Sequence, residues 1–404
     1  MARIASTVGV AFLALTTTFV YTHRDTLYTF YANRPGSLKD FNILPNAGVE
    51  HEDVVRNCED IYMDDVEGWA VLSCDPGRDK WNTVLGIFTD PLAPPETGLY
   101  LSRYSDPDYI EPQKLTLTNF HPGPANFHPL GITYDPGSKS LFVVHHAALG
   151  TRLETFRLNR DRLEAKHISS ISDPLLLTAN NVVALNSATL LVSNDHFFAK
   201  RSHGWLTMLE TYLALPLASL VRVDLDITRA QGPPNVTVLA RLPFANGVAV
   251  LNGTTVAVAS TVRAAVYLYT SPSGFAKGTA DVKLVETVRL HFLPDNLSVD
   301  SNGALLIAGH PFAPALEARA RAGTGGACGV LETATATGNG EEDGECPVAP
   351  SWVAEWTAEG GVRDLFVGRG FGSATTAVRD VGRGRGMVVG LYERGVLTWS
   401  ETEA

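Results

Sequence analysis

The chain has 404 residues, of which 45% are hydrophobic, and its formal net charge is −11. This length and apolar content are sufficient for a large buried core, and by length alone for more than one domain. Without a basic surplus to neutralise phosphates, the composition argues against a nucleic-acid partner, whereas acidity is compatible with divalent cations. The sequence also lacks a Gly-x-Ser-x-Gly elbow, a phosphate-binding loop, a dinucleotide fingerprint and a zinc-type Cys/His cluster, which argues against serine hydrolysis and nucleotide chemistry.

The chain begins with an apolar segment. After Arg3, an uncharged stretch runs from Ile4 to Tyr21. It is long for the core of a signal peptide and short for a transmembrane helix, and no clear small-x-small cleavage site follows it. We predict that residues 1–21 form an uncleaved signal anchor, with a cleaved signal peptide as the alternative. Either would direct the chain into the secretory pathway, membrane-anchored or secreted. Residues 22–50 are predicted to be a linker.

One pattern repeats through residues 51–404. Six times, a polar or small pair opens a short alternating apolar segment, and a turn and a second apolar segment follow. These opening pairs are Glu59-Asp60, Leu130-Gly131, Asn180-Asn181, Asn246-Gly247, Asp295-Asn296 and Thr375-Thr376. Period-2 segments with tight turns, repeating about every 50 to 80 residues, predict an all-β fold, a six-bladed β-propeller. In a propeller the starts of the innermost strands meet at a central channel.

The opening pairs also predict a metal site. Four of the six contain a carboxylate or a carboxamide. A ring of such oxygen donors around a narrow channel is typical of a metal centre, and hard donors favour calcium. Asn and Asp at strand starts also cap turns, which is the alternative for any one of them. Their recurrence at equivalent repeat positions favours a shared calcium channel.

The four cysteines fit an oxidising compartment. Cys58 and Cys74 lie on neighbouring predicted antiparallel strands, close enough to be bridged. Cys328 and Cys346 flank a segment rich in Gly, Thr and acidic residues, which predicts a surface loop within an insertion at about residues 315–350. That loop could be closed by its own disulfide. Four free thiols are the alternative.

Three N-glycosylation sequons add a prediction about the surface. Those at Asn235 and Asn252 are expected to accept glycan in a secreted chain. The third, at Asn296, falls in an opening pair and is expected to be buried and unmodified.

Several motifs together resemble the serum paraoxonase/arylesterase family of six-bladed calcium propellers. They occur in the order of the family over about residues 40 to 400 and are Glu59-Asp60, FHPLGIT at 127–133, LFVVHH at 141–146, NNVVAL at 180–185, SNDHFF at 193–198, PFANGV at 243–248 and LPDNLSVD at 293–300. The resemblance implies a calcium-dependent hydrolase of small apolar lactones or aryl esters. It also implies two calcium ions in the channel, one catalytic and one structural.

The resemblance implies a ligand set for each ion. The catalytic ion would be held by Glu59, Asn180, Asn246, Asp295 and Asn296. Two anionic and three neutral side chains leave room in the shell for water or a substrate carbonyl, which the ion can polarise. The structural ion would be held by Asp60, the backbone carbonyl of Ile132, and Asn181. Asn181 stands where the family usually has Asp, so this second site should bind calcium more weakly.

One position departs from the family. Leu130 replaces a histidine that is thought to act there as a general base on water. His128 lies on the same side of the predicted strand, and His146 matches the second histidine of the family's dyad. Asp295 is a third candidate, as a calcium-bound base or nucleophile. A turn residue for His128 and a packed strand residue for His146 are the structural alternatives.

Two further features complete the predicted pocket. His196 and His310 are similar to family positions that line or floor it. Residues 202–221 show helical spacing and predict a capping helix, which would wall the pocket, contact a membrane or simply pack on the propeller. Membrane contact is therefore predicted through residues 1–21 and 202–221. Leu130 leaves a second hypothesis open, a calcium-binding propeller without hydrolase activity that serves as a binding or structural module.

Overall fold

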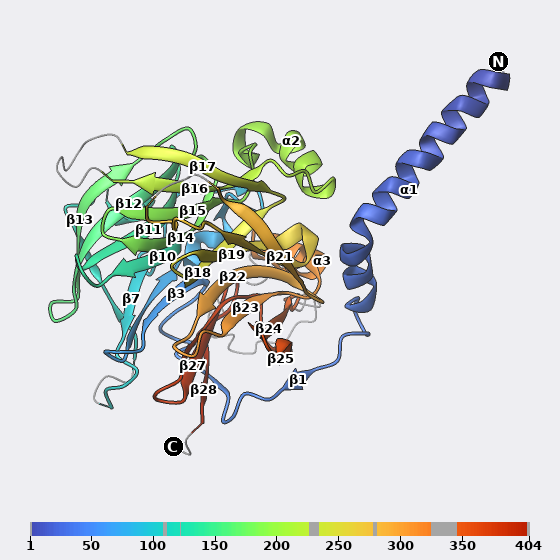
Figure 1. Ribbon diagram of the computed structural model, residues 1–404. Coiled ribbons are helices and arrows are strands. Elements are labelled where there is room, and N and C mark those ends of the chain that lie inside the picture. Colours follow the sequence, from blue (N-terminus) through green and yellow to red (C-terminus); the bar gives the residue numbers. More distant parts are fainter. Residues whose placement is uncertain are drawn as a thin grey trace, which may run out of the picture.

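The protein is a β-propeller (Figure 1). The computed structural model describes residues 2–107, 111–121, 123–225, 234–277, 281–324 and 346–401. Their strands form six sheets of four or five strands and one small two-stranded sheet. The predicted all-β, six-bladed fold is confirmed, because the six sheets follow each other around a ring and each begins with one of the predicted segments.

The innermost strand of each blade carries an opening pair. These strands are β3 (Cys58–Asp64), β10 (Pro129–Asp135), β14 (Ala179–Asn186), β18 (Ala245–Asn252), β22 (Leu293–Val299) and β26 (Ala374–Asp380). Each contacts the next in this order, and β26 contacts β3. The ring is therefore closed, and the starts of the inner strands surround one channel.

The remaining strands continue each sheet outward. The second strands are β4 (Trp69–Cys74), β11 (Ser140–Ala147), β15 (Thr189–Asn194), β19 (Thr255–Ser260), β23 (Leu305–His310) and β27 (Arg385–Gly390). The third strands are β7 (Gly98–Ser102), β12 (Gly150–Asn159), β16 (Ala218–Asp224), β20 (Ala265–Thr270), β24 (Pro350–Thr357) and β28 (Val396–Ser400). The fourth strands are β8 (Gln113–Lys114), β13 (Glu164–Ile171), β17 (Asn235–Leu242), β21 (Lys283–Arg289), β25 (Gly361–Gly372) and β2 (Gly48–Glu50).

Two N-terminal strands belong to the last two blades. β2 pairs with β28, and β1 (Phe41–Asn42) pairs with β25 as a fifth strand. The prediction that residues 22–50 are only a linker is therefore wrong, because backbone pairing joins the start of the propeller to its end. β9 (Thr116–Thr118) extends another blade, and β5 (Trp81–Asn82) pairs with β6 (Ile87–Phe88) near the channel.

The N-terminal helix is longer than the predicted anchor. α1 runs from Ala2 to Ala32, and its N-terminal end projects away from the propeller (Figure 1). Within the part of the chain that the structure describes, no helix is both long and apolar enough to cross a membrane. The C-terminal part of α1 is fixed to the propeller, because Asn33 donates hydrogen bonds to the carbonyls of His291 and Pro311 at 2.6 and 3.1 Å.

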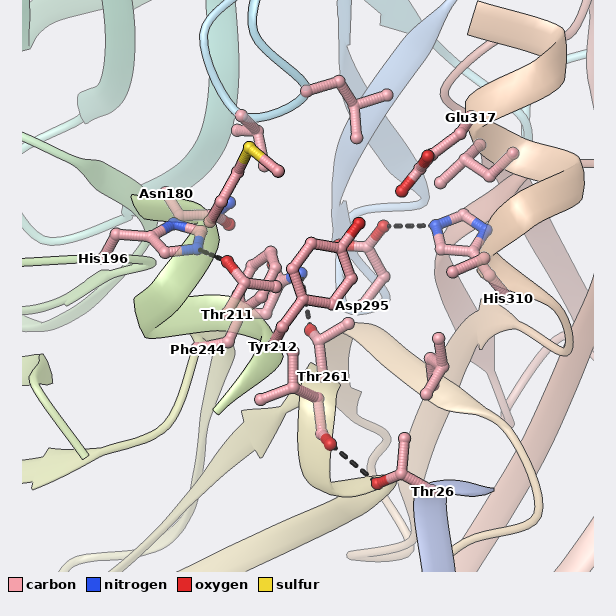
Figure 2. Close-up of a pocket in the computed structure, with 18 of the residues that line it drawn as sticks. Thr26, Asn180, His196, Thr211, Tyr212, Phe244, Thr261, Asp295, His310 and Glu317 are labelled. Atoms are coloured by element: carbon pink, nitrogen blue, oxygen red, sulfur yellow. Dashed lines mark hydrogen bonds and ion pairs between the residues drawn. The ribbon is translucent and has the colours of Figure 1, made fainter. Parts of the chain in front are cut away.

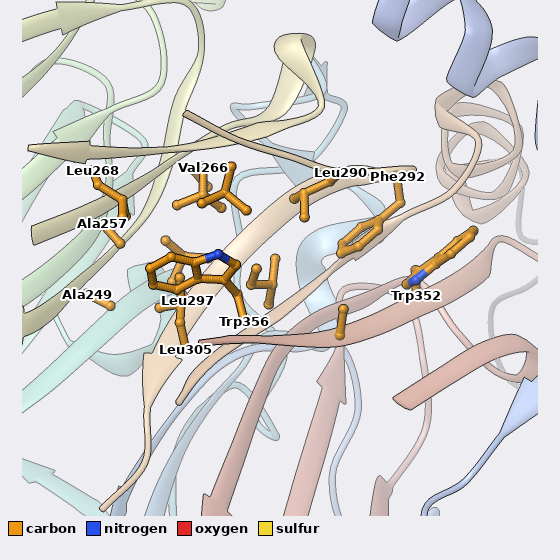
Figure 3. Close-up of a cluster of buried hydrophobic side chains, with 14 of the residues drawn as sticks. Ala249, Ala257, Val266, Leu268, Leu290, Phe292, Leu297, Leu305, Trp352 and Trp356 are labelled. Carbon is orange, nitrogen blue, oxygen red and sulfur yellow. The ribbon is translucent and has the colours of Figure 1, made fainter. Parts of the chain in front are cut away.

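Hydrophobic clusters fill the interfaces between neighbouring blades. The cluster in Figure 3 joins the β18 and β22 sheets, with Leu268 and Val266 facing Leu305, Leu297 and Trp356. These side chains come from alternate positions of their strands, as period-2 patterning requires when one face of a sheet packs on the next. Equivalent clusters lie at the other five blade interfaces.

The disulfide prediction is confirmed for the first pair. Cys58 and Cys74 are directly opposed on β3 and β4 and are bonded to each other. Cys346 is also disulfide-bonded, whereas Cys328 lies outside the described residues. The predicted insertion at about 315–350 begins with a helix, α3 (Ala313–Thr324), and residues 325–345 lie outside the described residues.

A buried carboxylate shows how the second blade is stabilised. Glu154 of β12 lies between His145 and His167, at 3.1 and 2.9 Å from their nitrogens, and also accepts a hydrogen bond from Ser170. Burial raises the pKa of the Glu154 carboxyl, but the hydrogen bonds from the two imidazoles and the hydroxyl outweigh it and lower the pKa to about 2.

Candidate functional site

A cavity of about 270 Å³ lies at the end of the channel where the inner strands begin (Figure 2). Most of its wall is apolar and comes from α1, α2 (Lys200–Tyr212), α3 and the segments between the blades. The starts of the inner strands contribute polar side chains to its floor. The residues that form that floor include Glu59, Asn180, Asn246 and Asp295.

The inner strands are irregular at the positions that form this floor. In all six blades the pairing register of the first two strands shifts at the opening pair. A bulge of this kind re-aims side chains and lets successive residues serve a site at the end of a sheet. Neighbouring openings also approach closely, because a Cβ added at Gly247 would lie 2.5 Å from the Cα of Asn296. The opening glycines are therefore required by packing rather than by a turn.

The floor contains buried oxygen atoms without partners. No described residue hydrogen-bonds to Oε2 of Glu59 or to Oδ1 of Asn180, Asn246 and Asn296. These four residues are at most 4% exposed. A buried acceptor left unpaired costs about 1 to 3 kcal/mol, and four of them in one place form a donor set that a cation could satisfy.

The electrostatics of the floor agree with this interpretation. Burial raises the pKa of Glu59 well above its ordinary value, and the nearby carboxylates of Asp60 and Asp295 raise it further. The amide of Asn296 donates a 2.9 Å hydrogen bond to the other Glu59 oxygen. Since carboxylate and amide oxygens are the ligands that calcium prefers, the donor set fits a calcium ion. No cluster of three or more Asp, Glu, His and Cys ligands occurs among the described residues, so the set depends on its asparagines.

A second polar layer lies next to the first. Both oxygens of Asp60 are occupied by donors, the backbone amides of Ile61 and Ile132 and the side chains of Thr376 and Asn181. Burial raises the pKa of Asp60 to about 7 against the opposing effect of these hydrogen bonds. Oδ1 of Asn181 accepts from the amide of Val248 at 3.3 Å. The predicted structural calcium ligands are thus brought together, but they satisfy one another, and Ile132 offers its amide to Asp60.

Comparison with known proteins gives the family. An arylesterase family model matches residues 102–331, which is more than half of the chain. The chain belongs to the arylesterase family. It is 28% identical over 193 residues to serum paraoxonase/arylesterase 2 of Canis lupus familiaris and to serum paraoxonase/arylesterase 1 of Mus musculus, covering 46% of this chain and 50% of each relative. It is 28% identical over 204 residues to serum paraoxonase/lactonase 3 of Oryctolagus cuniculus, covering 49% and 53%.

The chain thus spans about half the length of the curated relatives that it matches. Among solved structures, a gluconolactonase candidate superposes with a TM-score of 0.51 at 15% identity, covering 91% of this chain and 96% of the other. At that identity the likeness supports the propeller fold alone. The resemblance to the paraoxonase/arylesterase family noted in the motifs is confirmed.

Two predicted catalytic histidines of this arylesterase-family chain lie away from the cavity. His128 is held by Asp75 and by the carbonyl of Pro91, each at 2.9 Å. His146 bonds to the hydroxyl of Thr83 and to the carbonyl of Ala179. Burial lowers the pKa of His146 to about 4. Neither histidine lines the cavity, and both nitrogens of each are occupied, so neither can accept a proton from water there.

The third predicted catalytic residue, Asp295, does line the cavity. Its Oδ2 accepts a 2.8 Å hydrogen bond from Nε2 of His310, and Figure 2 shows this pair facing the open space. His196 also lines the cavity and is held by Asp195 and Thr211 at 2.8 and 2.7 Å. Leu130, which stands where the resemblance would place a general base, is buried in the cavity wall.

Sequence reasoning missed several cavity residues. Lys200 at the start of α2 and Glu317 in the second turn of α3 lie in the wall, and a whole face of α1 contributes as well. The helical spacing of the α1 residues was the one sequence signal for any of these positions, because it places them on one face of a helix. The sequence does not show which surface that face contacts. The predicted capping helix at 202–221 is partly wrong, since α2 ends at Tyr212 and β16 occupies residues 218–224.

Proposed function

We propose that this chain is a calcium-dependent hydrolase of lactones or aryl esters. The observation that carries the proposal is the cluster of unpartnered, buried oxygens of Glu59, Asn180, Asn246 and Asn296 beneath an apolar cavity. A cavity of about 270 Å³ is of the size of a small ester, and its walls suit an apolar acyl or aryl group. The relatives named as arylesterases and lactonases support the same reaction class.

Residues at different positions in the site have different roles. Glu59, Asn180, Asn246, Asp295 and Asn296 would hold calcium, which when bound polarises an ester carbonyl and stabilises negative charge on its oxygen. The apolar wall binds the rest of the substrate and limits the entry of bulk water. Asp295 and His310 form the one carboxylate–imidazole pair on the described cavity wall.

This pair is where we place the proton transfer. His310 donates from Nε2 to Asp295, so its Nδ1 keeps a lone pair, and that atom is buried without a described partner. Water attacks the carbonyl carbon and gives a proton to the Asp295–His310 pair. The ester C–O bond then breaks, and the alkoxide leaves with that proton. The pair thus takes over the function that Leu130 cannot perform.

The test measures hydrolysis of a panel of γ-lactones and phenyl esters by the purified chain, with calcium and with a chelator. We expect activity to require calcium and to fall in Asn246→Ala. Isothermal titration with calcium alone provides a readout independent of turnover. Activity that is indifferent to calcium, with no calcium binding, would refute the proposal.

A second candidate is a calcium-binding propeller without turnover. It is favoured by the occupied nitrogens of His128 and His146, the expected bases. Calcium binding without hydrolysis of any lactone or ester in the panel would support this function instead.

We further infer a secretory location and contact with a lipid surface. The Cys58–Cys74 disulfide supports an oxidising compartment. The apolar face of α2 is open to solvent, with Trp205 67% and Tyr212 60% exposed, and Tyr21 on α1 is 66% exposed. Amphipathic aromatic side chains of this kind suit a lipid interface.

This inference is tested by flotation with phosphatidylcholine vesicles, because α2 has no Lys or Arg beyond Lys200 and Arg201 at its start, and so no basic face that would need anionic lipid. Trp205→Ser should reduce flotation, whereas Val66→Ser, at an exposed turn between β3 and β4, should not. Equal flotation of both variants would contradict lipid contact through α2.

A further inference from the structure

His23 is an unassigned polar group in the cavity wall. It lies on α1 within a face made of Phe19, His23, Thr26, Leu27 and Phe30, all of which line the cavity. Its side chain is buried, with only 9% of the residue exposed. Its other neighbours on this face of α1 are apolar apart from Thr26, so the imidazole is the one titratable group that α1 contributes to the described cavity lining.

The helix that presents His23 is fixed in place by several hydrogen bonds. The hydroxyl of Thr26 donates to the carbonyl of Val262 at 2.7 Å. Arg263 donates to the carbonyl of Thr22 at 2.6 Å, on the same turn of α1 as His23. Asn33 anchors the end of the helix as described above. The position of His23 over the cavity is therefore set by the propeller rather than by α1 alone.

The protonation pattern of the ring follows from its contacts. Nδ1 lies 2.9 Å from the carbonyl oxygen of Phe19 and 3.0 Å from Oγ1 of Thr22. The single hydroxyl hydrogen of Thr22 is directed to the carbonyls of Thr18 and Phe19, so Oγ1 acts as an acceptor toward the ring. Both partners of Nδ1 are acceptors, and Nδ1 must carry the hydrogen. In the neutral ring, Nε2 then has a free lone pair.

That lone pair has no partner among the described residues. Nε2 of His23 is buried and unbonded, and the ring is held flat against Phe19 with centroids 4.2 Å apart. The stack and the Nδ1 bonds hold the ring in place. A buried and unsatisfied acceptor on a residue that lines a cavity can discriminate between ligands that can and cannot donate to it.

We propose that His23 is a specificity-determining residue that accepts a hydrogen bond, at Nε2, from a donor group on the apolar part of the substrate. The substrate class is a lactone or ester whose side chain carries a hydroxyl or an amide N–H at a distance from the reacting carbonyl. The inference rests on the proposed lactone or ester substrate, and it adds a polar requirement to a cavity that otherwise selects for apolar groups.

The test uses ligands that cannot be hydrolysed, so that binding is measured apart from turnover. 2-Alkylcyclopentanones keep the ring carbonyl but have no ester bond. A series bearing a hydroxyl at successive chain carbons is compared with the matching methyl ethers, which keep the oxygen but not the donor. With the full chain and calcium, calorimetry should show about tenfold tighter binding of the hydroxyl form at one chain position.

Variants assign that preference to the imidazole. His23→Phe keeps the stacked ring and removes Nε2, so the ratio of the two dissociation constants should fall to about one, as expected for loss of a single hydrogen bond. His23→Gln retains an acceptor and should keep part of the preference. Tyr28→Phe is the matched control, since Tyr28 lies on the exposed face of α1, 63% exposed, and should keep the whole preference.

The inference is overturned if the wild-type chain binds both forms equally, if it binds neither, or if the preference persists in His23→Phe. Turnover of the corresponding γ-lactones is measured in parallel. Turnover by a wild-type chain that shows no preference between the two forms would refute the role of His23 alone. A preference that depends on His23, without any turnover, would refute the proposed hydrolase alone.

Discussion

Asn246→Leu is the sharpest perturbation of the proposed calcium site. Its Oδ1 has no partner, while Nδ2 donates a 3.1 Å hydrogen bond to Thr261. Leucine has a similar size and removes both groups. Without calcium, relief of the unpaired acceptor and loss of one hydrogen bond are each worth about 1 kcal/mol, so the two nearly cancel. We therefore expect little change in stability when calcium is chelated.

With calcium the two proteins should differ. At 1 mM calcium and a dissociation constant of about 10 µM, binding would stabilise the wild-type fold by about 2.7 kcal/mol. An unfolding entropy of about 2.1 cal/mol/K per residue, summed over about 350 ordered residues, converts this into a rise in Tm of about 4 °C. If loss of one ligand weakens binding about 100-fold, the rise in the variant should be below about 1 °C.

Differential scanning calorimetry with and without calcium measures both quantities. The matched control is Asn194→Leu, because Asn194 is also buried, with an unpartnered Oδ1 and a bonded Nδ2, but lies outside the cavity wall. This control should keep the full calcium-induced rise. An equal rise in Asn246→Leu, or no rise in the wild-type chain, would show that the floor is not a calcium site.

Three further predictions concern other parts of the molecule. The double variant Cys58→Ser/Cys74→Ser should lower the free energy of unfolding by about 3 kcal/mol, as expected for loss of a loop of this size, and urea unfolding would check this. His310→Gln should lower kcat about 10² to 10⁴-fold. His128→Asn should lower the Tm but leave kcat of the folded fraction nearly unchanged. Equal effects of the two variants on kcat would contradict the assignment of proton transfer to His310. Glu154→Gln should lower the free energy of unfolding at pH 7 by up to about 3 kcal/mol, because the folded pKa of about 2 lies below the unfolded value of about 4.3. This stability is present above the unfolded pKa and is lost as the pH falls through the folded one, so the gap between wild type and variant in urea unfolding should close from about pH 5 to pH 2; a gap independent of pH would contradict it.

The repeat itself determines most of the fold. Alternation with period 2 requires strands that are buried on their faces, and six copies with tight turns leave few arrangements other than a closed ring. The positions of the oxygen donors could also be predicted from the sequence, because the start of every inner strand must reach the channel. Cys58 and Cys74 could be paired for the same reason, since adjacent antiparallel strands bring such positions opposite each other.

Only the tertiary structure decided which of the channel residues are free to act. His128 and His146 have the right residue type and spacing, but buried partners from distant segments, Asp75 and Ala179, occupy their nitrogens. His310 has a partner that belongs to the site itself, Asp295. Such assignments depend on the environment of each nitrogen, which sequence spacing does not specify.

The first helix shows the same limit. Its composition indicates an apolar segment at the start of the chain, and period 3.6 would place Phe19, His23 and Phe30 on one face. Which surface that face covers depends on contacts with Val262, His291 and Pro311, far away in the sequence. Local patterning determines the elements and the face that each buries, whereas the partner of that face is chosen by long-range packing of the closed ring.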